Sequence, residues 1–392
     1  MRFSPIIGPS SYVSSLCHSI LRGELFSTCS VGCIYCYARW YRGAHGKEKP
    51  LWESLKLIKM LGGIIREGLA ITPIRVSTLS DPFQGEGKIT LKFLKLALKE
   101  KVPVIINTKL IPREKHIKTI ERLAEEGLVV VQVSLPTLEE TKVLEPFSPS
   151  PGQRLELIER LSRAGVPTIV RVQPFVPGWI RDIHTFIEEI ASAGARMIIL
   201  EFLRIEKELL PLFSKLFPGE DIYKREWESY LPGTSTEEAP LLHPPLDYRL
   251  SIAREFSIKA EKEGLAFSTC KEGLFEFHTP LNVDCCGMAF FDVEYISRRP
   301  TLWDLYLEIV ENGKAKGEDL WERCRREELL CRENLTPYPR WFRRGFIAHE
   351  KRLESVLRKP HIVERITPSI KYENGYFIKR KERSNSGYNS FF

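Results

Sequence analysis

The chain has 392 residues, of which 43% are hydrophobic and 28% are charged, a balance typical of a globular protein with room for two or three domains. No apolar run approaches the roughly 18 residues of a membrane-spanning helix. The opening residues, Met1-Arg-Phe-Ser-Pro5, lack the layout of a signal peptide. We therefore expect a cytoplasmic protein without a membrane segment, in a compartment where thiols stay reduced and can hold a metal cluster.

The sequence pattern alternates between strands and helices from residue 24 to residue 205, after a short lead-in at 1–22. Continuous apolar runs predict the strands, and apolar residues at helical spacing predict the helices. The expected strands are 24–28, 74–79, 102–108, 128–135, 168–173 and 196–203, and the expected helices are 51–66, 90–100, 113–126, 151–164 and 181–193. This alternation predicts a parallel sheet covered by helices. It fits a partial (βα)6 barrel and a doubly wound open sheet equally well.

Three cysteines follow the first expected strand, in the segment Cys29-Ser-Val-Gly-Cys33-Ile-Tyr35-Cys36. A loop this short can direct three thiolates toward one point, as an iron–sulfur cluster requires. Three ligands leave one iron of a [4Fe–4S] cluster open, and an open coordination position is where a small molecule binds and reacts. The alternatives are three cysteines that only pack, or a zinc knuckle, for which His45 is the candidate fourth ligand.

The spacing C-x3-C-x2-C, with Tyr35 before the last cysteine, resembles the signature of the radical S-adenosylmethionine (radical SAM) superfamily. This resemblance implies a partial (βα)6 TIM-like barrel over residues 23–205. It also implies a [4Fe–4S] cluster held by Cys29, Cys33 and Cys36, which cleaves S-adenosylmethionine to methionine and a 5′-deoxyadenosyl radical. The electron would come from a reductant protein such as ferredoxin or flavodoxin.

Further segments resemble the spore-photoproduct-lyase-like branch of that superfamily. They are Tyr-Cys36-Tyr-Ala-Arg39, Ser80-Asp-Pro-Phe-Gln84, Leu-Glu145-Pro146, Arg154-Leu and Gln173-Pro174…Pro177-Gly178. The branch implies that Tyr35 belongs to the cofactor-binding loop and that Ser80 and Asp81 lie by the amino group of S-adenosylmethionine, where many relatives carry Gly-Gly-Glu. Ser134 would approach the ribose, and Arg171 or Lys109 the methionine carboxylate. A zwitterionic ligand needs such partners at its two ends, although each residue could instead be an ordinary polar residue at the mouth of a barrel.

One departure from this branch concerns the hydrogen donor. Spore photoproduct lyase uses a cysteine near the end of its second strand to return a hydrogen atom to the product radical. Here that strand reads Val76-Ser-Thr-Leu-Ser-Asp81, and no cysteine occurs between Cys36 and Cys270. We therefore expect the radical chemistry to carry over, but not photolesion repair with that donor.

Residues 206–339 form an expected extension in which the alternation stops, apart from a helix at 246–263. It contains five cysteines, which are candidates for a second iron–sulfur cluster or a zinc site: Cys270, Cys285, Cys286, Cys324 and Cys331. No C-x2-C pair supports such a site. Buried thiols or a disulfide are the alternatives.

The positive charge of the chain is concentrated in residues 340–392, which hold 13 Lys and Arg against 5 Asp and Glu. This segment also contains Trp, Tyr and Phe, a composition that can neutralise phosphates and stack on bases. The segment is therefore a basic tail and a candidate for binding nucleic acid. The composition is somewhat better explained by a solvated basic helix at 352–359 with a disordered end at 379–392. Scarce Gln and Met, with abundant Lys, Arg and Glu, are also typical of a thermophile.

We thus expect a radical SAM enzyme that abstracts hydrogen from a substrate, with a nucleic acid as the first candidate substrate and a peptide or small metabolite as the second. The alternative is a non-catalytic iron–sulfur or zinc protein that binds nucleic acid. Cleavage of S-adenosylmethionine by the reduced protein distinguishes the two.

Overall fold

One parallel sheet of seven strands organises the computed structural model, which describes residues 6, 13–39, 46–47, 49–231 and 239–380. The strands are β1 (Arg22–Gly23), β2 (Ile74–Val76), β3 (Val104–Thr108), β4 (Val129–Ser134), β5 (Thr168–Phe175), β6 (Met197–Phe202) and β9 (Ala266–Thr269). They lie side by side in chain order, all parallel. A doubly wound sheet would reverse its strand order at a switch point. The sequential order therefore confirms the predicted partial barrel.

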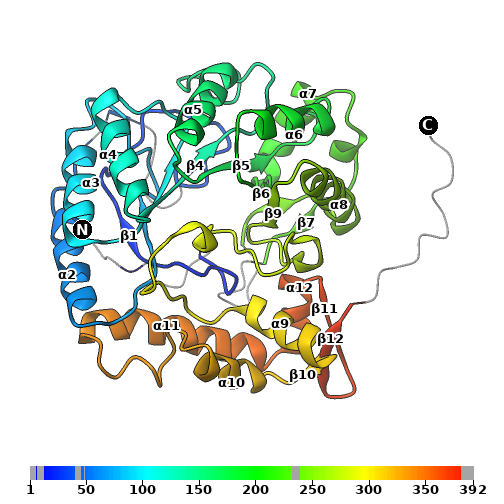
Figure 1. Cartoon of the computed structure of the whole chain (residues 1–392). Coiled ribbons are helices and arrows are strands. Elements are labelled where there is room, and N and C mark those ends of the chain that lie inside the picture. The colour runs from blue at the N-terminus through cyan, green and yellow to red at the C-terminus, as the bar shows by residue number, and fades with distance from the viewer. Residues whose placement is uncertain (1–5, 7–12, 40–45, 48, 232–238, 381–392) are drawn as a thin grey trace.

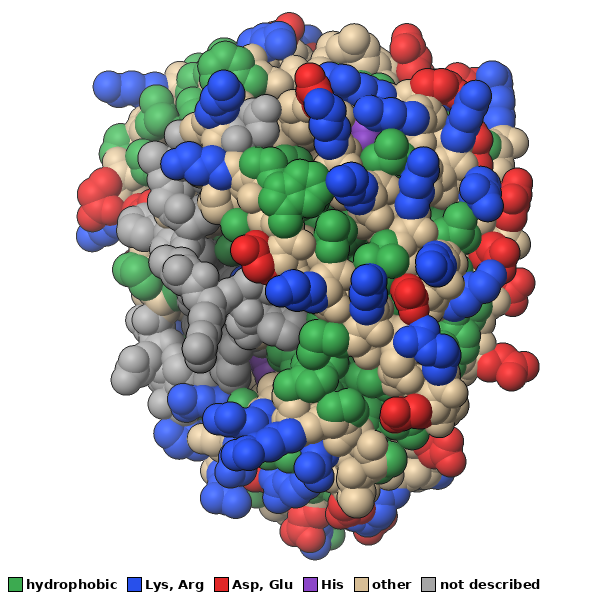
Figure 2. Space-filling view, turned by 90° about the vertical axis from the view of Figure 1, so that its left-hand side faces the viewer, with side chains coloured by type: hydrophobic (Ala, Val, Ile, Leu, Met, Phe, Trp, Pro, Cys, Tyr) green, Lys and Arg blue, Asp and Glu red, His purple; other side chains and the backbone are tan. Residues whose placement is uncertain are grey.

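Six helices lie around the convex side of this sheet (Figure 1). They are α2 (Ser54–Arg66), α3 (Lys88–Glu100), α4 (Glu114–Glu125), α5 (Pro151–Arg163), α6 (Ile183–Ser192) and α8 (Leu246–Lys262). Each lies within a few residues of its predicted range, because amphipathic spacing is a local signal. In α3, for example, Phe93 and Leu94 are buried, while Lys88, Lys92 and Lys95 are exposed. Lys and Arg side chains gather on this face of the molecule among fewer acidic ones (Figure 2).

The first strand differs from its prediction. The sequence predicts a strand at 24–28, but β1 covers Arg22–Gly23 and pairs with Arg75 and Val76 of β2. The residues after it bond to a returning segment instead, since the N–H of Ser27 donates to the Lys49 carbonyl (3.0 Å) and Phe26 bridges to Pro50. That pairing is non-local, so the apolar run alone could not reveal it.

The sheet separates two apolar layers. Outward side chains such as Val104 and Ile106 pack under the helices, whereas Ile105, Val130 and Ile169 fill the inside of the barrel. A segment that begins at Cys285 closes the barrel from within: the Gln132 side-chain amide donates to the Cys286 carbonyl (2.9 Å). This two-sided burial explains why the strands read as continuous apolar runs.

The C-terminal part of the chain packs on the open side of the barrel (Figure 1). It contains α9 (Leu302–Asn312), α10 (Asp319–Arg326), α11 (Arg340–Leu357), α12 (Pro360–Ile366) and a small sheet of β10 (Lys314–Ala315), β12 (Tyr376–Lys379) and β11 (Ile370–Glu373). Between β6 and α8 lie α7 (Leu210–Leu216) and the hairpin of β7 (Glu228–Ser229) and β8 (Leu242–His243). Among the described residues, no helix has the length and apolar character needed to span a bilayer.

The segment predicted as a basic tail is folded as far as residue 380. Phe342 and Phe346 of α11 are buried and stack on each other with ring centroids 4.5 Å apart, and Phe377 of β12 is also buried. These aromatic rings belong to the core, so they cannot stack on bases. Residues 381–392, most of the end predicted to be disordered, lie outside the described part of the chain.

Candidate active site

The three cysteines Cys29, Cys33 and Cys36 lie in the loop between β1 and α2, here called the cysteine loop (residues 29–36). None of the three is disulfide-bonded, and Cys29 and Cys33 are buried. The Gln84 side chain fixes the start of this loop by accepting from the Ser30 N–H (2.9 Å) and donating to the Thr28 carbonyl (2.8 Å). His45, the candidate fourth zinc ligand, lies outside the described residues.

Gly32 allows a neighbouring segment to cover the cysteine loop. Its φ is +74°, a conformation that favours glycine, and a Cβ there would lie 2.9 Å from the Phe147 ring. The N–H of Phe147 donates to Val31 (3.3 Å), and the N–H of Ile34 donates to Leu144 (3.0 Å). The loop is therefore held between Gln84 on one side and residues 144–147 on the other.

A buried charged network joins the cysteine loop to the barrel. Tyr35 donates its hydroxyl to Glu145, and Glu145 pairs with Lys109 (2.8 Å) and with Arg154 (2.8 Å). Burial alone would raise the pKa of the Glu145 carboxyl, but Lys109 and Arg154 outweigh it and lower that pKa to about 2. Ser134 also belongs here, because it accepts from Lys109 Nζ (2.6 Å).

A cavity of about 420 Å³ lies above the cysteine loop, at the C-terminal ends of the strands. All three cysteines and all five other predicted cofactor-binding residues line it: Tyr35, Ser80, Asp81, Ser134 and Arg171. The structure thus places the three cysteines and these five residues around one cavity.

The polar groups of this cavity differ in whether protein groups already hydrogen-bond to them. Asp81 accepts from the N–H groups of Phe83 (2.9 Å) and Lys109 (2.7 Å) and from the Thr108 hydroxyl (3.0 Å), so it joins the loops after β2 and β3. In contrast, Ser80 Oγ and Asn107 Oδ1 are buried without a hydrogen-bond partner among the described residues. Because buried polar atoms are normally hydrogen-bonded, these two atoms fit a polar ligand.

Arg171 on β5 is tied into the barrel. It donates to the side-chain oxygens of Gln132 (2.6 Å) and Gln173 (2.6 Å), and Glu201 lies 3.9 Å away. Arg171 therefore supplies positive charge to the cavity wall, while most of its N–H groups already donate to other side chains of the protein.

Sequence analysis missed several residues of the cavity wall, including Tyr230 and Lys271. Lys271 follows β9 and pairs with Glu201 (3.3 Å), and its ammonium lies 5.2 Å from the Tyr37 ring centre. Tyr230 stacks under Arg204, 4.2 Å from its guanidinium carbon. Both come from the region after residue 205, where the alternation of elements stops. A four-residue strand such as β9 is too short for a periodic signal.

The cysteine loop fits an iron–sulfur cluster in its chemistry. Burial raises the pKa of the Cys33 thiol, and the neighbouring Glu145, Cys36 and Cys29 add to this effect, while Lys109 opposes it. Bound cationic iron would stabilise all three as thiolates. No three His, Cys, Asp or Glu side chains in the described residues already converge as a metal site. The three sulfur atoms would therefore draw together on binding.

The cysteines of the C-terminal extension form two separate groups. Cys324 and Cys331 are joined by a disulfide, since α10 ends at Arg326 and the chain then turns back. Cys270, Cys285 and Cys286 lie inside the barrel, where a hydrogen bond from Cys285 lowers the pKa of Cys270 to about 7. They are not arranged as a metal site among the described residues.

Comparisons with known proteins give a family for part of the chain. Residues 24–190 match the model of the radical SAM superfamily. An uncharacterised protein of Acidianus two-tailed virus is 29% identical over 139 residues, which cover 33% of this chain and 46% of the viral protein. An uncharacterised protein of Methanocaldococcus jannaschii is 26% identical over 187 residues, which cover 45% of this chain and 68% of that protein. The first match thus spans less than half of its relative.

Two solved structures are similar to part of this chain. Spore photoproduct lyase complexed with dinucleoside spore photoproduct has a TM-score of 0.49 at 16% identity, covering 64% of this chain and 77% of that chain. Streptococcus suis SuiB bound to S-adenosylmethionine has a TM-score of 0.42 at 12% identity, covering 64% of this chain and 48% of that chain. The three cysteines lie within the matched range, and residues 24–190 form a radical SAM domain.

Proposed function

We propose that this protein binds a [4Fe–4S] cluster on Cys29, Cys33 and Cys36 and S-adenosylmethionine in the adjoining cavity, and that it abstracts hydrogen from a substrate that enters the same cavity. One observation carries this proposal. Three cysteines that are not disulfide-bonded line the same cavity as Ser80 Oγ and Asn107 Oδ1, two buried polar atoms with no hydrogen-bond partner in the described part of the chain. The bound cluster would supply the electron that cleaves S-adenosylmethionine to methionine and a 5′-deoxyadenosyl radical.

The residues of the chain would hold and orient the ligand. Ser80 Oγ, to which none of the described residues hydrogen-bonds, is suited to the amino group of S-adenosylmethionine. Asp81 would act by fixing the loop that presents Ser80, since its oxygens are already engaged. Arg171 and Lys109 would offer positive charge to the methionine carboxylate. Ser134, the residue expected near the ribose, would be oriented by Lys109.

We assign the domain to the spore-photoproduct-lyase-like branch because of the sequence segments quoted above. Two residues of these segments, Glu145 and Arg154, form a buried ion pair (2.8 Å) beside the cysteine loop. Lesion repair with a strand-two cysteine is not part of the proposal, because that strand has none. The second metal site is not carried forward either, since Cys324 and Cys331 are bonded to each other. A ferredoxin or flavodoxin would supply the electron.

The test uses reconstituted full-length protein reduced under anaerobic conditions. We expect about four irons per chain and release of 5′-deoxyadenosine and methionine from S-adenosylmethionine. Cys33→Ala should lose the bound iron and the release of the two products. The control is Cys17→Ala, which removes a buried cysteine that does not line the cavity. This variant should keep the iron and the cleavage. A protein that holds iron but never cleaves S-adenosylmethionine would favour the alternative, a non-catalytic binding protein.

A further inference from the structure

Three large apolar side chains are exposed beside the cysteine loop, and we call them the apolar patch. Phe147 is 71% exposed, Val143 is 58% exposed and Ile111 is 37% exposed. The Phe147 ring also rests on the cysteine loop itself, because a Cβ at Gly32 would lie 2.9 Å from it. Single exposed apolar residues are ordinary, but several on adjoining segments indicate a surface that binds a partner.

The two segments that carry the apolar patch are joined to each other and to the cysteine loop. The ion pair of Lys109 with Glu145 (2.8 Å) links the segment at 109–111 to the segment at 143–147. Leu110 packs in the same apolar cluster as the cysteines of the loop. The patch is therefore separated from these cysteines by little more than the loop itself. Because the rate of electron transfer falls steeply with distance, this is a favourable place from which to reduce a cluster in the loop.

Three exposed cations near the patch have no carboxylate partner among the described residues. Lys142 donates to a backbone carbonyl (3.3 Å), and Arg113 donates to the carbonyl of Gly85 (3.2 Å). Lys47 adjoins the start of the cysteine loop, since its own carbonyl accepts from the Thr28 hydroxyl (2.5 Å). A carbonyl orients a cation but does not neutralise its charge.

The acidic side chains of the same segments are largely paired. Glu86 pairs with Lys88 (2.6 Å) and Glu139 pairs with Arg181 (3.4 Å). The Glu140 carboxylate accepts from a backbone N–H (2.8 Å) and keeps its charge. The surface around the patch thus has a surplus of positive charge.

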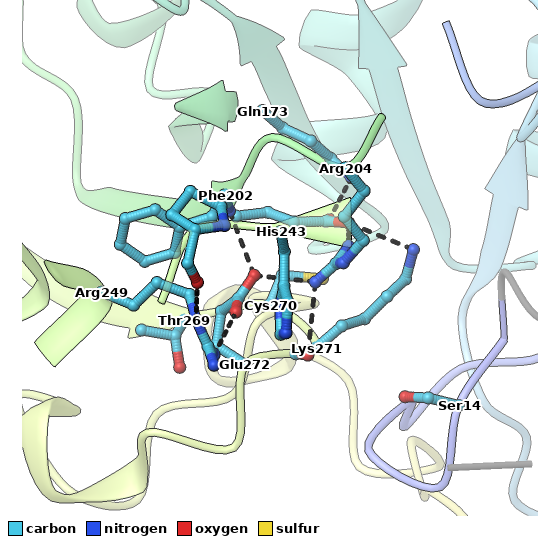
Figure 3. A network of polar contacts seen from close by, with 12 residues as sticks. Ser14, Gln173, Phe202, Arg204, His243, Arg249, Thr269, Cys270, Lys271 and Glu272 are labelled. Atoms are coloured by element: carbon cyan, nitrogen blue, oxygen red, sulfur yellow. Dashed lines mark hydrogen bonds and ion pairs between the residues drawn. The ribbon is translucent and has the colours of Figure 1, made fainter. Parts of the chain in front are cut away.

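Cations inside the barrel are in a different situation. Arg204 and Arg249 both donate to Glu272, at 2.7 Å and 3.1 Å, as Figure 3 shows. Their charge is neutralised within the protein, so they offer little attraction to an acidic partner. The charge near the apolar patch is instead available at the surface, where it can attract such a partner over a distance.

We propose that the apolar patch, with Lys47, Arg113 and Lys142, is the docking surface for an acidic protein that carries one electron. This inference rests on the proposed function, and it places the reductant beside the cysteine loop. One electron leaves the carrier, which is thereby oxidised, and reduces the bound cluster. No bond forms or breaks, and no proton is transferred. An apolar centre with charged surroundings suits the small, short-lived interfaces of electron-transfer proteins.

The first test measures binding to the full-length protein with its cluster. The probe is purified oxidised flavodoxin, an acidic one-electron carrier, titrated by calorimetry. We expect binding that weakens as salt is added, because salt screens exposed charges. Val143→Glu and Lys142→Glu should each weaken it about tenfold. The matched controls are Val310→Glu on α9 and Lys95→Glu on α3, which alter exposed positions elsewhere and should leave the affinity unchanged.

The second test compares two reductants. Reduced flavodoxin must dock before it delivers its electron, whereas dithionite is a small anion that needs no docking surface. At flavodoxin concentrations below saturation, Val143→Glu and Lys142→Glu should each release 5′-deoxyadenosine about tenfold more slowly. With dithionite, both variants should match the wild type. An equal loss with both reductants would mean that the substitutions damage the site itself, and it would overturn the proposal.

The remaining outcomes separate the claims. Absence of flavodoxin binding, unchanged affinity in both patch variants, or an equal loss in the controls overturns the docking surface. A single-stranded oligonucleotide that binds more tightly than flavodoxin and is lost in the same variants would assign the surface to nucleic acid instead. A protein that cleaves S-adenosylmethionine with dithionite but does not bind flavodoxin refutes only this inference. A protein that binds flavodoxin on the patch but cleaves S-adenosylmethionine with neither reductant refutes the proposed function.

Discussion

Replacing Glu145 by Gln tests how the cysteine loop is held. The wild-type carboxylate is fully buried between Lys109 and Arg154, and Arg154 is itself buried. Glutamine would leave both cations without a counter-charge. The pKa of Glu145 falls from 4.5 to about 2 in the folded protein. At 1.36 kcal/mol for each pKa unit, that shift corresponds to about 3 kcal/mol, within the range of about 3–5 kcal/mol for breaking a buried ion pair.

The assay is urea unfolding of the full chain without its cluster, so that loss of iron does not add to the transition. We expect Glu145→Gln to lower the free energy of unfolding by about 3 kcal/mol at neutral pH. Because the folded pKa is depressed, this stabilisation is present above pH 4.5 and is lost as the pH falls through about 2. The difference between wild type and variant should therefore shrink over that interval.

The matched control is Glu159→Gln, which removes the exposed pair between Glu159 and Arg163 on α5. Such a pair contributes about 0.5 kcal/mol or less. A loss below about 1 kcal/mol for Glu145→Gln, or a loss equal to that of the control, would refute the view that this network holds the cysteine loop.

Three further predictions concern other parts of the chain. Unfolded, non-reduced protein should expose seven reactive thiols in a thiol titration, and a count of nine would contradict the disulfide between Cys324 and Cys331. Burial lowers the pKa of His278 from 6.5 to about 4. As the pH falls, this histidine therefore binds a proton in the unfolded chain before it does so in the folded chain. The free energy of unfolding should then fall by about 1.4 kcal/mol per pH unit between pH 6.5 and pH 4 because of this histidine. In urea unfolding, His278→Gln should reduce this dependence on pH. Asp81→Asn should weaken S-adenosylmethionine binding about tenfold in equilibrium dialysis, because the variant loses a carboxylate oxygen that accepts hydrogen bonds and fixes the loop of Ser80. Unchanged affinity would show that Asp81 does not position this loop for the ligand.

The sequence predicted the βα units and the residues of the first cavity because their signals are local. A run such as Val129–Ser134 is recognised as a strand from its own apolar residues, and the cysteine spacing predicts a ligand loop without further context. In a parallel barrel the C-terminal ends of all strands lie at the same face. This arrangement brings Ser80, Ser134 and Arg171 together.

Other features depend on contacts between distant segments and could not be read in this way. Lys271 reaches the first cavity only because β9 adds a seventh strand beside β6. Arg171 reads as a free cation in the sequence, but Gln132 and Gln173 occupy its donors. The aromatic residues of the C-terminal segment suggested base stacking, yet Phe342 is needed to bury the open side of the barrel.

The central claim is that the cysteine loop and its cavity form a site that cleaves S-adenosylmethionine. The most direct measurement is the amount of 5′-deoxyadenosine and methionine released by the reduced, reconstituted protein over time. We predict equal molar amounts of the two products from the wild type and from Cys17→Ala, and neither product from Cys33→Ala. An iron-loaded, reduced wild-type protein that releases neither product would contradict the claim.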